Sequence, residues 1–175
     1  MKHLAIMGFK KTGKTLLATK IIEDLVGNGY RVAAVKHIHH EFTIDTEGKD
    51  TWRMARSGAS IVTSISPNEM AIIFPRQMHA TNIDDFLGKI FREHGIDVVV
   101  YEGFAKLYGR SPHVYKILTV RKSEDIGLIE EISPPVVAVF RLENTSLPEK
   151  GVPVYGPELS LDFFNHVRRS LGLVK

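Results

Sequence analysis

Cysteine is absent from the 175 residues, so the chain can form neither a disulfide nor a thiolate metal site. No apolar run approaches the roughly 18 residues that a membrane-spanning helix requires. The first residues also lack the long apolar segment of a signal peptide, because Lys10 and Lys11 interrupt it early. We therefore expect a cytoplasmic protein that does not enter a membrane.

The net charge of the chain is small as well. The 23 Lys and Arg residues exceed the 20 Asp and Glu residues only slightly, and the net charge is +3. This excess is scattered, whereas nucleic-acid binders gather it in a stripe, so we expect small anions such as nucleotides and no nucleic acid. Hydrophobic residues make up 43% of the chain, which suffices for one domain over residues 1–175 with a full core.

A glycine-rich motif close to the amino terminus is the most informative feature. Its pattern is that of a phosphate-binding loop, Gly8-x-x-x-x-Gly13-Lys14-Thr15. A short apolar strand at residues 4–6 precedes it, and a helical pattern at residues 16–25 follows. Strand, glycine loop and helix are the context that the motif requires, so we interpret it as a nucleotide site.

The residue types of the motif explain its chemistry. Gly8 and Gly13 let the backbone wrap around a phosphate, and the helix adds the positive end of its dipole. We predict that Lys14 reaches the β- and γ-phosphates and that Thr15 offers its hydroxyl to Mg²⁺. The predicted nucleotide-binding residues are Gly8, Lys10, Lys11, Thr12, Gly13, Lys14 and Thr15. For Lys10 and Lys11, a solvated loop is an equal alternative.

Alternating strands and helices predict an α/β fold. Apolar strands are expected at residues 31–35, 96–104, 115–121, 136–140 and 152–154, and a closing helix at residues 159–171. Residues 60–65 and 70–74 are expected to form an antiparallel hairpin added to the sheet. We predict a three-layer P-loop NTPase fold with a mostly parallel sheet.

Ligands of such sheets bind beyond the carboxyl ends of the strands. Lys36 and His37 end one strand there, and Glu102 ends another. Asp97 lies at the opposite end, roughly 16 Å away at about 3.3 Å per residue, and is left as a surface residue. We predict that Glu102 is the catalytic and Mg²⁺-side acid, directly or through water; a salt-bridged rim residue is the alternative.

A polar stretch at residues 37–53 leaves several roles open. His37, His39 and His40 could bind zinc or nickel, contact phosphate or other substrate groups, or form a solvated loop. In an extended turn His40 points away from the other two, which weakens a three-histidine site. Asp45 could complete the Mg²⁺ shell through water.

The same stretch contains the start of a predicted helix that runs to Ser57. Asp50 or Thr51 is expected to cap it, although Asp50 could equally have a functional role. Trp52 is interpreted as a core or dimer-interface aromatic residue.

Four motifs in this order resemble the molybdopterin-guanine dinucleotide biosynthesis protein B family. They are the phosphate loop, Lys36-His37-x-His39-His40, Ile44-Asp45-x-x-Gly48-Lys49-Asp50-Thr51-Trp52-Arg53, and Glu102-Gly103-Phe104. The resemblance covers the chain from Met1 to about Arg121. The histidine-rich turn and the Gly-Lys-Asp-Thr-Trp-Arg segment are its most specific parts.

The resemblance implies a homodimeric GTP-binding protein with weak GTPase activity. It would assist the molybdenum cofactor guanylyltransferase, which attaches GMP to molybdopterin. By position, GTP and Mg²⁺ would be bound by Gly8, Gly13, Lys14 and Thr15, with Glu102 on the acid-bearing strand. The adjoining surface for substrate or partner would comprise Lys36, His37, His40, Asp45, Lys49, Asp50 and Arg53.

Two departures accompany this resemblance. Ala105 separates the Glu-Gly-Phe motif from Lys106, whereas the family usually continues with lysine at once. The Asn-Lys-x-Asp guanine reader is absent, so the guanine preference rests on resemblance.

Two rival functions stay open. A small-molecule kinase would need a lid with arginines, which Arg53, Arg56 and Arg76 could supply. A metal-delivery GTPase is the other rival, suggested by the histidines.

Overall fold

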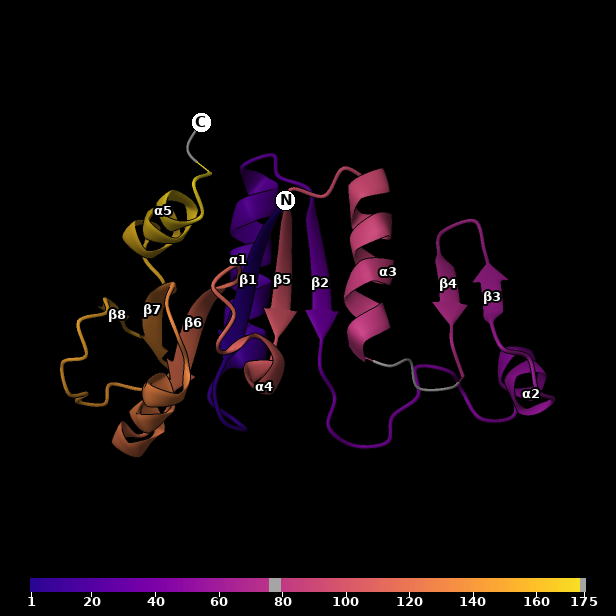
Figure 1. The fold of residues 1–175 in the computed structure, drawn as a ribbon, viewed down its shortest axis with the longest axis horizontal. Helices are drawn as coiled ribbons and strands as arrows, with labels where there is room; N and C mark the ends of the chain where they lie inside the picture. Colours follow the sequence, from indigo (N-terminus) through magenta and orange to yellow (C-terminus); the bar gives the residue numbers. More distant parts are fainter. Residues whose placement is uncertain (76–79, 174–175) are drawn as a thin grey trace. The chain divides into compact units, whose positions relative to one another are not determined.

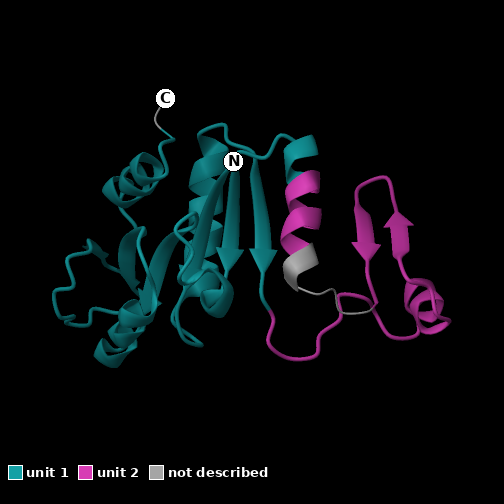
Figure 2. Ribbon diagram, viewed as in Figure 1, with its two compact units in different colours: residues 1–37, 91–175 teal, residues 38–90 magenta. Residues whose placement is uncertain are grey.

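The computed structural model describes residues 1–75 and 80–173 (Figure 1). They form two compact units, one of residues 1–37 and 91–175, the other of residues 38–90 (Figure 2). The single domain over residues 1–175 stays a prediction, and Arg76 lies outside the described residues. In the part of the chain that is described, no helix has the length and apolar character needed to cross a membrane.

A six-stranded sheet forms the centre of the first unit. Its strands are β1 (Lys2–Met7), β2 (Val32–Lys36), β5 (Val98–Glu102), β6 (Tyr115–Val120), β7 (Val136–Arg141) and β8 (Val154–Tyr155). Their order is β2-β5-β1-β6-β7-β8, and all neighbours run parallel. The predicted, mostly parallel sheet is therefore confirmed, with a short edge strand close to its expected place.

The strands of this sheet are buried on both faces. Along β1, Leu4 and Ile6 join one hydrophobic cluster, and Ala5 and Met7 join the other, because successive side chains point to opposite faces. Helices α1 (Lys14–Gly27) and α5 (Leu161–Ser170) cover the first face. The short helix α4 (Ala105–Tyr108) and the last turn of α3 (Ala80–Glu93) pack on the second. Three layers result, as predicted.

The second unit contains α2 (Asp50–Arg56), β3 (Val62–Ile65) and β4 (Met70–Ile73). The predicted antiparallel hairpin is present, and residues 66–69 form its turn, closed by a hydrogen bond from Ser66 N to Glu69 O at 2.8 Å. The expectation that it extends the parallel sheet is wrong. Within the described residues, β3 and β4 pair with each other in a separate two-stranded sheet.

Two short helices were not predicted. One is α4, whose four residues are too few to show a helical period. The other is the 3₁₀-helix η1 (Ser123–Glu131), which follows β6. The carboxylate of Asp125 accepts hydrogen bonds from the backbone N–H groups of Arg121 and Lys122, at 2.8 and 2.9 Å, and so fixes the start of η1.

One buried lysine holds the loops around β6. Lys116 is fully buried, and its ammonium donates to the carbonyl oxygens of Ser111, Ser133 and Pro134 at 2.5, 2.8 and 3.3 Å. Burial lowers the pKa of Lys116. Three carbonyls replace the water that its ammonium loses, so this side chain connects two loops of the first unit.

Replacing this lysine with methionine tests that role. Lys116→Met keeps a long apolar stem but leaves the three carbonyl oxygens without their donor. We expect the free energy of unfolding to fall by about 2 kcal/mol, measured by urea denaturation at neutral pH. Lys89→Met, which removes an exposed lysine of α3, is the control and should change it by less than about 0.5 kcal/mol. Equal stability of the two variants would show that the desolvation cost cancels the three hydrogen bonds.

Candidate functional site

The loop between β1 and α1 requires glycine at both ends of its motif. Gly8 has φ 152° and Gly13 has φ 87°, a region that other residues rarely adopt. A Cβ atom on Gly8 would lie 2.3 Å from Thr119 Oγ1 and 2.4 Å from the Thr119 carbonyl oxygen. The loop therefore folds directly against the carboxyl end of β6.

Two buried hydroxyl groups hold the loop in place. Those of Thr12 and Thr119 share a hydrogen bond of 2.6 Å. One hydroxyl donates this bond, and the other donates to a backbone carbonyl: Phe9 O lies 2.9 Å from the Thr12 hydroxyl and Met7 O 3.1 Å from that of Thr119. Thr119 was not predicted as a site residue. The signal that could have found it is a polar residue near the carboxyl end of an otherwise apolar strand.

The N-terminal end of helix α1 lies at this loop without a capping side chain. The first turn of the helix contains no acidic residue. The N–H groups of the first turn have no partner inside a helix, and the helix dipole adds positive potential there. Together with the glycine backbone, they form a place where an anion is favoured.

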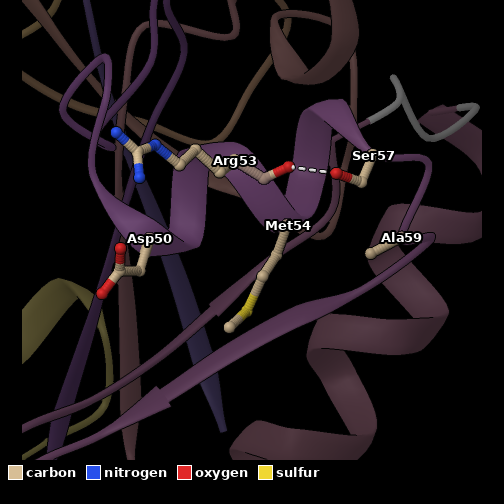
Figure 3. Close-up of a pocket in the computed structure, with 5 residues that line it drawn as sticks. All are labelled: Asp50, Arg53, Met54, Ser57 and Ala59. Atoms are coloured by element: carbon tan, nitrogen blue, oxygen red, sulfur yellow. Dashed lines mark hydrogen bonds between the residues drawn. The ribbon is translucent and has the colours of Figure 1, made fainter.

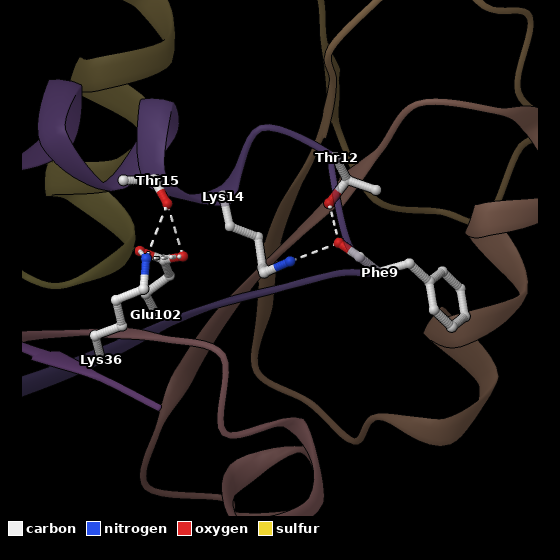
Figure 4. A network of polar contacts seen from close by, with 6 residues as sticks. All are labelled: Phe9, Thr12, Lys14, Thr15, Lys36 and Glu102. Carbon is white, nitrogen blue, oxygen red and sulfur yellow. Dashed lines mark hydrogen bonds and ion pairs between the residues drawn. The ribbon is translucent and has the colours of Figure 1, made fainter. Parts of the chain in front are cut away.

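Lys14 lies folded across the loop. Its Nζ donates to Phe9 O at 2.5 Å (Figure 4). Burial lowers the pKa of Lys14; the Glu102 carboxylate raises it and the Lys36 ammonium lowers it further. A partly desolvated cation at a helix start is suited to an incoming phosphate oxygen, which is a stronger acceptor than a carbonyl.

Thr15, Lys36 and Glu102 meet beside the loop, each from a different element (Figure 4). The Thr15 hydroxyl donates to Glu102 Oε1 at 2.7 Å, and the Lys36 ammonium lies 3.0 and 3.1 Å from the two Glu102 oxygens. Lys36 and Glu102 are paired in the register of β2 and β5, so both strands end at the same edge. The sequence-based placement of these residues is therefore confirmed, whereas their roles stay predictions.

These groups fit a magnesium nucleotide. Glycine backbone that a Cβ would block, free helix N–H groups and the Lys14 ammonium suit the phosphates. A hydroxyl and a carboxylate side by side are oxygen ligands of the kind that Mg²⁺ binds. Lys10 and Lys11 are exposed on the same loop, and Lys11 has a φ of 65°.

Aromatic residues shape the edge next to Glu102. The backbone N–H of His37 donates to Glu102 O at 3.0 Å, and the His37 ring stacks on Phe104 with centroids 4.9 Å apart. Phe104 has φ 61°, which is rare for a residue with a side chain and is typical of functional sites. The sequence marked Phe104 as part of a motif but did not predict this conformation.

The remaining predicted residues belong to the second unit. Asp45 Oδ1 accepts hydrogen bonds from the Thr51 hydroxyl at 2.8 Å and from Thr46 N at 2.9 Å. The predicted cap of α2 is wrong, because Lys49 holds that position and makes no side-chain cap. The Thr51 hydroxyl donates to Asp45 instead. Asp50 lies inside the first turn, where the positive end of the helix dipole stabilises its negative charge.

A shallow pocket of about 530 Å³ lies on α2 (Figure 3). It is lined by Asp50, Arg53, Met54, Ser57 and Ala59. The Ser57 hydroxyl donates to the backbone carbonyl oxygen of Arg53 at 2.8 Å (Figure 3). The Arg53 guanidinium extends away from this bond (Figure 3). Asp50 and Arg53, both predicted for the substrate or partner surface, thus share one pocket, and Lys49 is not part of its lining.

The histidines of the polar stretch are divided between the units. His37 belongs to the first, whereas His39 and His40 are exposed residues of the second. Over residues 1–75 and 80–173, no three His, Asp or Glu side chains gather into a group that could hold a metal ion.

Comparison with known proteins gives consistent matches. Residues 3–141 match the family described as molybdopterin guanine dinucleotide synthesis protein B, or MobB. A molybdopterin-guanine dinucleotide biosynthesis adapter protein from Haemophilus influenzae is 34% identical over 155 residues, covering 86% of this chain and 83% of the relative. A probable adapter protein of the same name from Bacillus subtilis is 23% identical over 162 residues, covering 90% and 88%.

Solved structures agree in fold. The crystal structure of Bacillus subtilis MobB superposes with a TM-score of 0.74 at 20% identity, covering 98% of each chain. A crystal structure of molybdopterin-guanine biosynthesis protein B gives 0.67 at 26% identity, covering 97% of this chain and 98% of that one. The match over most of the length shows that this chain belongs to the molybdopterin guanine dinucleotide synthesis protein B family.

Proposed function

We propose that this protein is a GTP-binding adapter in the synthesis of molybdopterin guanine dinucleotide. The observation that carries the proposal is the Thr15–Glu102 hydrogen bond beside a glycine loop across which Lys14 lies, bonded to Phe9 O. The names of its relatives support the pathway, because they are described as adapter proteins of this biosynthesis.

In this proposal the loop binds the phosphates of GTP. Backbone N–H groups of the loop and of the first turn of α1 donate to the phosphate oxygens. Lys14 exchanges its bond to Phe9 O for a phosphate oxygen, a stronger and charged acceptor. Lys10, Lys11 and the backbone of Thr12 complete the proposed binding loop.

Thr15 and Glu102 are the proposed holders of Mg²⁺, directly or through water; for Asp45, in the second unit, a contact through water stays a prediction from the sequence. When bound, Mg²⁺ neutralises charge on the phosphates and favours attack at phosphorus. Lys14 and Glu102 are the groups that we propose to act in a weak GTPase reaction. A weak rate is consistent with an adapter, whose function depends on the bound nucleotide more than on its turnover.

The partners proposed are the guanylyltransferase of the molybdenum cofactor and its molybdopterin substrate. Two sets of residues are proposed to face them: Lys36 and His37 on the first unit, and His40, Asp45, Lys49, Asp50 and Arg53 on the second. Lys36, Lys49 and Arg53 are cations that suit the phosphate of a pterin, and the pocket on α2 offers an apolar wall beside Arg53.

A homodimer is proposed from the surface of the second unit. On β3 and β4, Thr63, Ile65, Met70 and Ile72 share one face, and all four are exposed. Phe42, Ile44, Met54 and Ile61 of the same unit are also exposed. Apolar side chains gathered in so short a segment are typical of an interface, and a second copy would cover them.

Nucleotide titration tests the proposed function. Isothermal titration with GTP and ATP in the presence of Mg²⁺ should show binding, with GTP the tighter ligand. Lys14→Ala should weaken GTP binding about 10- to 100-fold, because one charged hydrogen bond is lost. Lys20→Ala, at an exposed position of α1, should leave it unchanged. Equal or tighter binding of ATP would refute the guanine preference.

The adapter role is tested on the partner enzyme. A pull-down with purified molybdenum cofactor guanylyltransferase should recover the complex, and GTP with Mg²⁺ should strengthen it. In Lys14→Ala this nucleotide effect should disappear while the protein stays folded, because the phosphates lose their anchor. Recovery that is the same with and without GTP in the wild-type protein would argue against a nucleotide-dependent adapter.

Sedimentation of a variant tests the dimer. Ile65→Glu places a charge on the exposed hairpin face, where the side chain is 79% exposed, and should convert the dimer to a monomer. Leu161→Glu is the matched control, since Leu161 is 77% exposed at the start of α5. A wild-type protein that sediments as a monomer at micromolar concentration, or an Ile65→Glu dimer, contradicts the proposed interface.

A further inference from the structure

The ammonium of Lys36 lies against the oxygens that we propose for the metal. It is 3.0 and 3.1 Å from the two carboxylate oxygens of Glu102 and 3.3 Å from the hydroxyl oxygen of Thr15 (Figure 4). The Thr15 hydroxyl in turn donates to Glu102 at 2.7 Å. A lysine therefore uses the same three oxygens that a divalent cation would need.

An ammonium and a magnesium ion compete for these oxygens. Mg²⁺ binds oxygen at about 2.0–2.1 Å in a strict octahedron, so its ligands must turn lone pairs towards it. Each Glu102 oxygen is in contact with the Lys36 ammonium, and the Thr15 hydroxyl donates its proton to the carboxylate. Two positive charges a few ångströms apart also repel each other, and the Lys14 ammonium adds a third.

We infer that Lys36 is a built-in competitor for the cation position formed by Thr15 and Glu102, and that it couples metal binding to nucleotide binding. The inference rests on the proposed function, because it assumes that these residues hold the metal. A divalent ion that arrives alone must break the Lys36–Glu102 pair and gains no negative charge beyond that of Glu102 itself. A nucleotide brings phosphate charges, which receive the displaced ammonium and attract the ion.

The placement of Lys36 allows this exchange. Its side chain is 53% exposed, whereas that of Glu102 is 14% exposed, so the carboxylate is held in position and the lysine is the partner free to move. Lysine carries a compact charge on a flexible four-carbon stem, which loses little when it changes partner. β5 separates β2 from β1, but the Lys36 ammonium reaches across to within 3.3 Å of Thr15 Oγ1, so it stays near the phosphates after it leaves Glu102.

Titration with Mn²⁺ followed by electron paramagnetic resonance tests the inference without nucleotide. Mn²⁺ prefers oxygen ligands in an octahedral arrangement, as Mg²⁺ does. Lys36→Met should bind Mn²⁺ about tenfold more tightly than the wild-type protein, because the competing ammonium is gone. Lys36→Arg, which keeps the charge, should restore the wild-type affinity.

Lys20→Met is the matched control. Lys20 is 47% exposed and pairs with Glu23 at 2.7 Å, so this variant also removes an exposed cation from an ion pair. It should leave the Mn²⁺ affinity unchanged, which would show that net charge alone does not explain the effect. Affinity in Lys36→Met that is no tighter than in the wild type, or undetectable in both, overturns the inference.

A second titration separates this inference from the proposed function. With a fluorescent GDP analogue bound, the Mn²⁺ affinities of the wild-type protein and of Lys36→Met should differ by less than about threefold, because the phosphates have already drawn the ammonium away from Glu102. A difference of about tenfold that persists with nucleotide bound would overturn the coupling role of Lys36 and leave the proposed function standing. Failure of the wild-type protein to bind any nucleotide would refute the proposed function, whereas the Mn²⁺ titration would still decide on Lys36.

Discussion

The register of three parallel strands is the constraint on which the site depends. β1 lies between β5 and β6, and Ile6 is paired with both Glu102 and Ile117. The pairing with β5 puts the Glu102 carboxylate level with the start of the glycine loop, and the pairing with β6 puts Thr119 beneath Gly8. A shift by one residue would turn Glu102 towards the opposite face of the sheet. A shift would also expose apolar side chains that are buried on both faces, so burial of the core holds the register. The same register positions the residues of the site.

Electrostatics then sets what the edge of the sheet can bind. Lys14, Lys36 and Glu102 act on each other, and the two ammonium groups exceed the one carboxylate. The free amino end of α1 adds to this positive potential, because no acidic side chain lies in its first turn. A polyanion is the ligand that relieves the imbalance. A lone cation would increase it, which supports the proposal that a metal ion binds here together with phosphates.

Much of the first unit could be predicted from the sequence, because its signals are local. The glycine motif, the apolar strands and the position of Glu102 at a strand end follow from spacing and from the rules for parallel sheets. The contacts of Thr119 and Lys116 could not be predicted, since each depends on loops far away in the chain. The cap of α2 was misplaced for a similar reason: Thr51 has a better partner in Asp45, and a pattern of residue types does not show that competition.

The sheet to which the predicted hairpin belongs could not be predicted, for a reason that bears on the proposed dimer. The alternation of residues in the hairpin correctly indicated two antiparallel strands, but nothing in that pattern states which sheet they join. Among the described residues of the second unit, Val62 is the one hydrophobic side chain that is buried, and Ile65, Met70 and Ile72 are exposed. A two-stranded sheet with so small a core is marginal by itself, since stability needs further strands or a covering layer. Burial of the hairpin face in the proposed dimer would therefore contribute to the stability of the second unit as well as to assembly.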